Sequence, residues 1–339
     1  MITTGMSNKS PFISVLVPNY GYSPYIFDCL DTLVNQKESD EFAYEILFYD
    51  QNEIETFNKI KSEIENRYQN RVTVIHSDVK GLLRARHMLT REAKGQYCAF
   101  VDSDDFVDSD FLVTLYENLK KSNFPDILIH NYVRCDSKGV DHLGIYNPPK
   151  CKDEEIMDYY LFTNLFNEVV RKLFKKELYK VDDTVDMSSV ICEDWIFSYP
   201  LMKEAKSIYY AYDVQKYHYR LNDASLLHTI KFERAMDNLS VHDKYLADYV
   251  LNDFQKKLFD SQNIMTFVAL GDLLINDKNL TKEQFKMFVD NAINHLYDVD
   301  IDDSEGFELT KNHKTIYRLL KKKAYGRLKL IFKIRKLLK

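Results

Sequence analysis

The first hundred residues alternate short apolar runs with longer segments of helical periodicity. The short runs are typical of buried strands and lie at Phe12–Val17, Tyr44–Tyr49, Val72–His76 and Gln96–Val101. Between them, apolar residues recur at helical spacing over 25–35, 53–68 and 82–93. Successive strand–helix units predict an α/β class with a mostly parallel sheet flanked by helices.

The pattern becomes increasingly helical further along the chain. A helix is expected over 111–122, a strand over 126–132, helices over 154–179 and 193–204, and a strand over 207–212. Beyond about residue 230 only helices are expected, one of them opened by a capping box of Thr281 and Gln284. We therefore expect an α/β domain over 10–230, a helical C-terminal domain over 231–310 and a separate tail over 311–339.

Charge distinguishes the tail from the rest of the chain. The net charge is −6, but residues 311–339 contain twelve Lys or Arg and no acidic residue, which leaves residues 1–310 at −18. Several apolar residues of the tail share one helical face: Leu320, Ala324, Leu328, Ile331, Ile334 and Leu338. This pattern favours an in-plane helix on an anionic membrane surface. A solvated arm, or docking on the acidic body or on a partner, stays open, and nucleic acid is not an expected partner.

Cysteine usage and hydropathy indicate the cellular compartment in which the protein is expected. The five Cys are far apart and form no CxxC pair, which favours free thiols in a reducing compartment. The N-terminus has no apolar signal region, and no run of about 18 apolar residues exists. We expect a cytoplasmic protein, peripheral on the inner face of the cell membrane if the tail binds there.

The strongest local signal is a run of acidic residues that directly follows the fourth apolar strand, Asp102-Ser103-Asp104-Asp105. In parallel sheets, ligands bind beyond the carboxyl ends of the strands, and Pro18 and Asp50 fall at the same edge. Two carboxylates there can share Mg²⁺ or Mn²⁺ with substrate phosphates. The competing interpretation is an ordinary helix cap by Asp105 or Ser109.

Several motifs in this order resemble family 2 glycosyltransferases of the GT-A fold, a Rossmann-like fold of nucleotide-diphospho-sugar transferases. They are FISVLVPNY, LFYD, GLLRARH, GQYCAFVDSDDF, RKLFKKEL, ICEDWIFSYPLMKEAKSIYY and YHYRLNDASL, over residues 12–228. The resemblance implies an inverting, metal-dependent hexosyltransferase using Mn²⁺ or Mg²⁺. Its donor would be a nucleotide sugar, with UDP the leading nucleotide. Its acceptor would be a saccharide or lipid-linked glycan in bacterial polysaccharide, teichoic acid or capsule synthesis.

The same resemblance implies a donor site. Asp104 would be the metal ligand, Asp102 would bind the ribose and assist the metal, and Asp50 would bind the nucleotide base. The implied donor-binding residues are Pro18, Tyr20, Asp50, Arg86, Asp102, Ser103, Asp104, Arg220 and Ser225. Tyr20 would stack on the base or simply pack, and Asp105 would be structural or contact the donor sugar.

The implied catalytic residues are Asp194, as general base, and Glu193, which would orient Asp194, bind acceptor or itself be the base. Ordinary helix-terminus chemistry is the alternative for one of the pair. Trp195 and Lys172 would contact the acceptor, although core packing and a surface position are the respective alternatives.

One departure weakens the resemblance. Relatives continue after the Asp50 position with a second Asp and a Gly-Ser turn, whereas this chain has Gln51-Asn52-Glu53. A catalytically impaired nucleotide-sugar-binding or scaffold protein of a glycan assembly complex is therefore the alternative function. The sugar, the acceptor, the linkage and any homo-oligomer stay open.

Overall fold

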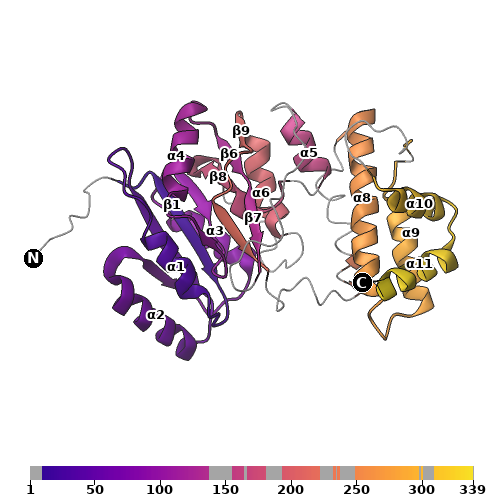
Figure 1. The fold of residues 1–339 in the computed structure, drawn as a ribbon, viewed down its shortest axis with the longest axis horizontal. Helices are drawn as coiled ribbons and strands as arrows, with labels where there is room; N and C mark the ends of the chain where they lie inside the picture. The colour runs from indigo at the N-terminus through magenta and orange to yellow at the C-terminus, as the bar shows by residue number, and fades with distance from the viewer. Residues whose placement is uncertain are drawn as a thin grey trace, which may run out of the picture. The chain divides into compact units, whose positions relative to one another are not determined.

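The structure is a computed structural model, and it falls into two compact units. It describes residues 10–136, 155–163, 166–180, 193–221, 232–233, 235–236, 249–297, 299–300 and 309–338. The first, here called the sheet unit, comprises residues 1–156 and 166–222; the second, the helical unit, comprises 157–165 and 223–339. Figure 1 shows the sheet unit in indigo to salmon and the helical unit largely in orange to yellow.

A seven-stranded sheet forms the core of the sheet unit, with the strand order β3-β2-β1-β4-β8-β6-β9. Its strands are β1 Ile13–Asn19, β2 Tyr44–Asp50, β3 Thr73–His76, β4 Tyr97–Phe100, β6 Ile127–His130, β8 Lys172–Lys175 and β9 Ile208–Ala211. Only β8 runs against its neighbours β4 and β6, and the other pairs are parallel. The expected mostly parallel α/β sheet is confirmed.

Helices connect these strands and cover the sheet. They are α1 Ile26–Val34, α2 Ile54–Tyr68, α3 Leu82–Glu92, α4 Phe111–Lys121 and α6 Glu193–Glu204, with 3₁₀ turns η1 Gln69–Arg71, η3 Val169–Arg171 and η4 Lys176–Leu178. Chain order steps outward from β1 to β3 and then returns across β1 to β4. Right-handed connections therefore place α3 on the face opposite α1 and α2, where it contacts α6.

The strand register brings the site residues to one edge. Asn19 lies opposite Asp50, and Asp50 lies opposite His76, at the carboxyl ends of β1, β2 and β3. Leu16 pairs with Phe100, so the chain leaving β4 towards Asp102 reaches the same level. The strand order reverses between β1 and β4, which is where open α/β sheets bind ligands.

The helix expected over 154–179 is wrong. Residues Ile156–Phe162 form α5, but the chain then forms η3, the strand β8 and η4. Leu173 and Phe174 are fully buried, with β4 and β6 paired on either side of their strand. A short buried strand between basic residues has no period-2 alternation, so the apolar pattern alone could not separate it from a helix.

A small second sheet was not foreseen either. It consists of β5 Phe106–Val107, β10 Tyr217–Arg220 and β7 Tyr132–Cys135, in that order. Tyr217 pairs with Val107 on one side and with Tyr132 on the other. This sheet brings Arg220 beside the acidic segment that follows β4.

The helical unit contains α5, α8 Asp253–Leu274, α9 Lys282–Asn294, α10 Lys311–Lys321 and α11 Tyr325–Leu338. The capping box of Thr281 and Gln284 is present at the start of α9, as expected. A buried core is shared by α8, α9, α10 and α11. Within the described ranges, none of the helices combines the length and apolarity that crossing a membrane requires.

The tail differs from its expected form. It is two helices, α10 and α11, separated by a break where Lys323 has a φ of 49°. Leu320 and Leu328, central to the expected membrane-facing stripe, are buried in the core with Phe332. An apolar stripe on a helix packs against any available apolar surface, and α8 and α9 supply it. The tail is therefore packed within the helical unit, as the docking alternative expects.

Candidate functional site

Asp50 ends β2 and is fully buried, with its carboxylate held by amide donors. Asn19 Nδ2 donates to Oδ2 at 2.7 Å, and Asn52 donates from its backbone N at 2.9 Å and from Nδ2 at 2.8 Å. Such donors stabilise a buried charge. Ser103 Oγ in turn donates to Asn19 Oδ1 at 2.8 Å, which joins the end of β1 to the acidic segment after β4. Neither Asn was foreseen, although an Asn directly after an apolar strand is a signal for such a bond.

Gln51, which stands where relatives have a second Asp, has a structural role in this chain. It is buried, its Nε2 donates to Val79 O at 2.7 Å, and its Oε1 accepts from Gly81 N at 3.2 Å. Gly81 precedes α3 and has a φ of 139°, a backbone conformation that residues with a side chain rarely adopt. Gln51 thus fixes the turn into α3, the helix that carries Arg86.

Tyr20 and Pro18 differ in accessibility. Pro18 lies within β1 and is buried, opposite Tyr49. Tyr20 lies just beyond the strand and is 63% exposed, with the Lys80 ammonium 5.1 Å from its ring centre. The packed alternative for Tyr20 is therefore disfavoured, and its ring is accessible to a planar ligand.

Asp105 is structural. It is buried, its Oδ2 accepts from Tyr217 Oη at 2.5 Å, and its Oδ1 accepts from Arg220 N at 2.8 Å. The same Tyr217 hydroxyl accepts from Asp102 N at 3.2 Å. Tyr217 therefore positions the whole acidic segment, a role that the sequence pattern did not reveal because the strand β10 was not foreseen.

Arg220 lies against the acidic segment. Its Nε donates to Asp104 O at 2.9 Å, and its guanidinium carbon lies 4.2 Å from the ring centre of Tyr25 and 4.9 Å from that of Phe106. This arrangement brings a positive charge to the segment. Ser225, the other residue expected from this region, lies outside the described residues.

Asp102 and Asp104 differ from Asp105 because their carboxylates accept no hydrogen bond from any other residue in the part of the chain that is described; Asp104 accepts one from its own backbone N–H. Burial raises the pKa of Asp104. Burial, with the charges of Asp104 and Asp194 and against Arg86, raises the pKa of Asp102 to about 7. Two carboxylates with no donor from another described residue, at a sheet edge, fit a hard cation or ligand hydroxyls.

No group of three or more His, Cys, Asp or Glu within the described ranges could by itself hold a metal ion. A metal at Asp104 and Asp102 would therefore need further oxygen ligands from a bound substrate. Mg²⁺ is commonly held in this way, by one or two carboxylates plus phosphates.

Arg86 links two of the expected site residues. Its side chain is 2% exposed and forms an ion pair with Asp194, which is 31% exposed at the start of α6. Burial lowers the pKa of Arg86, but the charges of Asp194, Asp102 and Glu193 outweigh burial and raise it. The structure therefore pairs Asp194 with a buried guanidinium, on which the charges of Asp102 and Glu193 also act.

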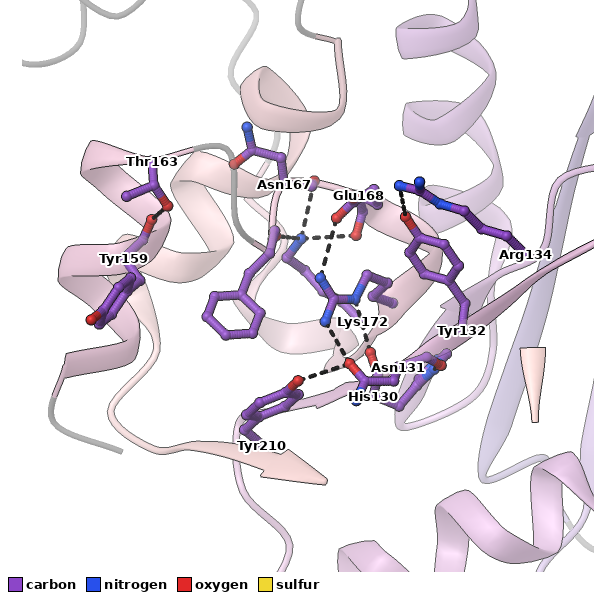
Figure 2. A network of polar contacts seen from close by, with 12 residues as sticks. His130, Asn131, Tyr132, Arg134, Tyr159, Thr163, Asn167, Glu168, Lys172 and Tyr210 are labelled. Carbon is purple, nitrogen blue, oxygen red and sulfur yellow. Dashed lines mark hydrogen bonds and ion pairs between the residues drawn. The ribbon is translucent and has the colours of Figure 1, made fainter. Parts of the chain in front are cut away.

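Lys172 is buried rather than accessible, and Figure 2 shows the contacts of its ammonium. Its ammonium donates to the carbonyls of Phe166, of Asn167 at 3.1 Å and of Glu168 at 3.0 Å. Burial, against the charge of Glu168, lowers its pKa to about 7. Both the expected acceptor contact and the surface alternative disagree with this position, since Lys172 holds the turn that precedes β8.

Arg171, beside Lys172, was not singled out and is fully buried. Its Nε donates to His130 O at 2.9 Å and its Nη2 to Asn131 Oδ1 at 2.9 Å. Tyr210 Oη donates to the same amide oxygen at 2.8 Å (Figure 2). These contacts join η3, directly before β8, to the ends of β6 and β9, at the edge of the sheet opposite β3.

Trp195 is also buried, and its ring stacks on Tyr199 with centroids 4.9 Å apart. The core-packing alternative therefore describes Trp195 better than the expected stacking on an acceptor sugar. Of the two expected acceptor contacts, neither side chain is accessible.

Known proteins similar to this chain include bacterial glycosyltransferases. Residues 14–182 match the model of the family Glycosyl transferase family 2. The poly(ribitol-phosphate) beta-glucosyltransferase of Bacillus spizizenii is 31% identical over 211 residues, which are 61% of this chain and 32% of that protein. Glycosyltransferase GlyG of Streptococcus pneumoniae is 29% identical over 71% of this chain and 82% of its own. This chain thus spans about a third of the Bacillus protein.

Among solved structures, residues 1–349 of TarS from S. aureus superpose with a TM-score of 0.64 at 16% identity, covering 96% of this chain and 92% of that one. The same protein is known in complex with UDP-GlcNAc, with a TM-score of 0.62 at 14% identity, covering 96% and 91%. Similarity at this level establishes the fold of the chain, including its C-terminal helices.

Proposed function

This chain belongs to glycosyl transferase family 2 through residues 14–182, and on that premise we propose that it transfers a sugar from a UDP-sugar to an acceptor hydroxyl with inversion. The observation that supports the proposal is the sheet edge where Asp102 and Asp104 accept no hydrogen bond from another described residue, while Asp194 pairs with Arg86, on which the charge of Asp102 also acts. The names of the relatives support an acceptor in teichoic acid or polysaccharide synthesis, either a saccharide or a lipid-linked glycan.

Asp194 is the proposed general base. The acceptor oxygen would attack the anomeric carbon, the bond from that carbon to the diphosphate oxygen would break, and the hydroxyl proton would pass to Asp194. About a third of its side chain stays accessible, while Arg86 holds the carboxylate from the protein side. Glu193, in the same first turn of α6, contributes negative charge to the cluster and is proposed to contact the acceptor.

The donor would lie along the carboxyl edge from β2 to β4. Asp50 and Tyr20 are proposed to bind the uracil, Asp50 by accepting its ring N–H and Tyr20 by stacking. Asp102 would bind the ribose, and Arg220 would offset charge on the diphosphate. Asp50 is fully buried and already accepts from Asn19 and Asn52, so a uracil N–H would reach this oriented carboxylate only after a shift of the side chains that cover it.

Asp104, with Asp102, is proposed to hold Mn²⁺ or Mg²⁺. When bound, the ion would neutralise the charge that grows on the leaving diphosphate. Arg220 and Arg86 would remain the protein's own sources of positive charge at this place.

The test is donor binding, measured as thermal stabilisation with UDP, UDP-glucose, UDP-GlcNAc and GDP-mannose, each with and without Mn²⁺. At a ligand concentration of ~100 Kd, binding adds about 2.7 kcal/mol, which corresponds to roughly 5 °C or more for a unit of this size. Asp104→Asn should remove the Mn²⁺-dependent part, while Asp213→Asn, in an exposed turn, should not. No stabilisation of the wild type by any nucleotide would favour a scaffold protein with an impaired donor site.

A further inference from the structure

The helix α11 has an apolar face that differs from the one buried in the core. Leu330, Ile334 and Leu337 are 56%, 47% and 84% exposed. Their spacing of four and then three residues places them on one side of the helix. Leu328 and Phe332 point into the core instead. Exposed large apolar residues grouped in this way are characteristic of an interaction surface.

Exposed basic residues lie on the same helix and on the helix before it. Arg327, Lys333 and Lys336 are exposed on α11, and Arg318, Lys321, Lys322 and Lys323 are exposed on α10 and the turn that follows it. The segment 311–339 contributes twelve basic and no acidic side chains.

The acidic residues that contact α11 are already engaged. Asp272 of α8 binds Arg335 through two bonds of 2.8 and 2.7 Å, and Asp290 of α9 accepts from Tyr325 Oη at 2.6 Å. These two carboxylates therefore do not neutralise the exposed basic side chains of α11.

We propose that Leu330, Ile334 and Leu337, with the exposed basic residues of α10 and α11, bind an anionic lipid bilayer with α11 lying in the plane of the interface. The apolar side chains would enter the acyl boundary while the Lys and Arg side chains reach the headgroups. A second copy of the chain is a poorer partner, because its α11 would bring the same positive charges. A polyanion without an apolar phase would leave the three apolar side chains in water.

A membrane partner would bring the proposed sugar transfer to a lipid surface. Only this biological role rests on the proposed function, and lipid binding itself does not. Lipid binding is measured without donor or acceptor, so its failure would leave sugar transfer standing. Loss of transfer would likewise leave lipid binding standing.

The experiment is sedimentation of the full chain with vesicles of phosphatidylcholine containing ~30% phosphatidylglycerol, a composition that gives a strong negative surface potential. Vesicles of phosphatidylcholine alone are the comparison. The wild type should bind the anionic vesicles and lose binding as salt screens the charges. Leu330→Ser with Leu337→Ser should weaken binding at least ~10-fold. Ile54→Ser with Val250→Ser, which changes two other exposed apolar residues, should not.

Charge is tested in parallel. Arg327→Glu with Lys333→Glu should abolish binding, whereas Lys59→Glu with Lys121→Glu, an equal charge change on the sheet unit, should preserve most of it. Circular dichroism and sedimentation velocity would establish that the variants fold and whether the chain self-associates. Equal binding by the α11 variants and their controls would overturn the proposal, as would an oligomer that dissociates on Leu330→Ser with Leu337→Ser while vesicle binding stays absent.

Discussion

Arg86 is the residue on which the charge balance of the site depends. Its buried guanidinium pairs with Asp194 and lies near Asp102 and Glu193. Arg86→Lys keeps the charge but loses the planar fork, so Asp194 would be less well oriented. We expect kcat for sugar transfer to fall by at least ~10-fold with little change in KM for the donor, measured by initial rates.

A matched control lies on the same helix. Arg91 is exposed at the end of α3, and Arg91→Lys should leave both kinetic constants unchanged. An Arg86→Lys enzyme with wild-type kcat would mean that the ion pair is only structural.

His130 predicts a pH dependence of stability. Burial lowers its pKa to about 4, from about 6.5 in an unfolded chain. Between these values the unfolded chain binds a proton that the folded chain does not, so stability falls as pH drops from about 6.5 to about 4. The full loss from this residue is about 3 kcal/mol.

The measurement is urea unfolding of the wild type and His130→Gln at several pH values from about 7 to about 4.5. This range covers most of the interval between the two pKa values. The wild type should lose stability relative to the variant as pH falls. Parallel pH profiles for the two proteins would show that His130 does not titrate as its burial implies.

At the scale of single residues, the acidic segment was predictable because it directly follows an apolar strand. The donors to Asp50 and the bond from Tyr217 to Asp105 were not, because they depend on partners from distant strands. Burial of Trp195 and Lys172 was equally hidden, since an apolar or basic residue near a motif can face inward or outward.

Among the helices, α11 packs so closely on α8 that one methyl group added at their contact should lower the stability of the helical unit. A Cβ on Gly271 would overlap the ring of the buried Phe332, whereas a Cβ on Gly326 would meet open space. Gly271→Ala should destabilise the helical unit by roughly 1–3 kcal/mol. Gly326→Ala should stabilise it by up to ~1 kcal/mol, since alanine favours the helix.

Urea or thermal unfolding of the full chain, followed by circular dichroism, measures both substitutions. If Gly271→Ala were neutral or stabilising, the close packing of α11 on α8 would be disproved.

The first three strand–helix units were predictable because each strand is an apolar run and each helix has one apolar stripe. The strand β8 was not, because a four-residue buried strand looks like a turn of helix in its apolar pattern. The tail shows the same limit, because its stripe indicated a helix and a buried face but not which surface covers that face. Only the packing of Leu320 and Leu328 against α8 and α9 decides this.

At the scale of the whole molecule, the net charge of −6 conceals two chemical environments. Some of the acidic excess is gathered at the carboxyl edge of the sheet, where Arg86 and Arg220 offset it. The basic excess is gathered on α10 and α11. Sugar transfer and lipid binding are thus assigned to different units, and each can be removed by substitution without changing the residues of the other.

Asp194 is proposed to act as the base in sugar transfer from a UDP-sugar. Its most direct test is UDP release from a UDP-sugar that stabilises the protein, with Mn²⁺ and with poly(ribitol phosphate) or water as trial acceptor. Turnover is expected from the wild type and from Asp213→Asn, with a loss of ~100-fold or more in folded Asp194→Asn. Equal turnover by Asp194→Asn and the wild type, or no UDP release by the wild type from any donor, would contradict it.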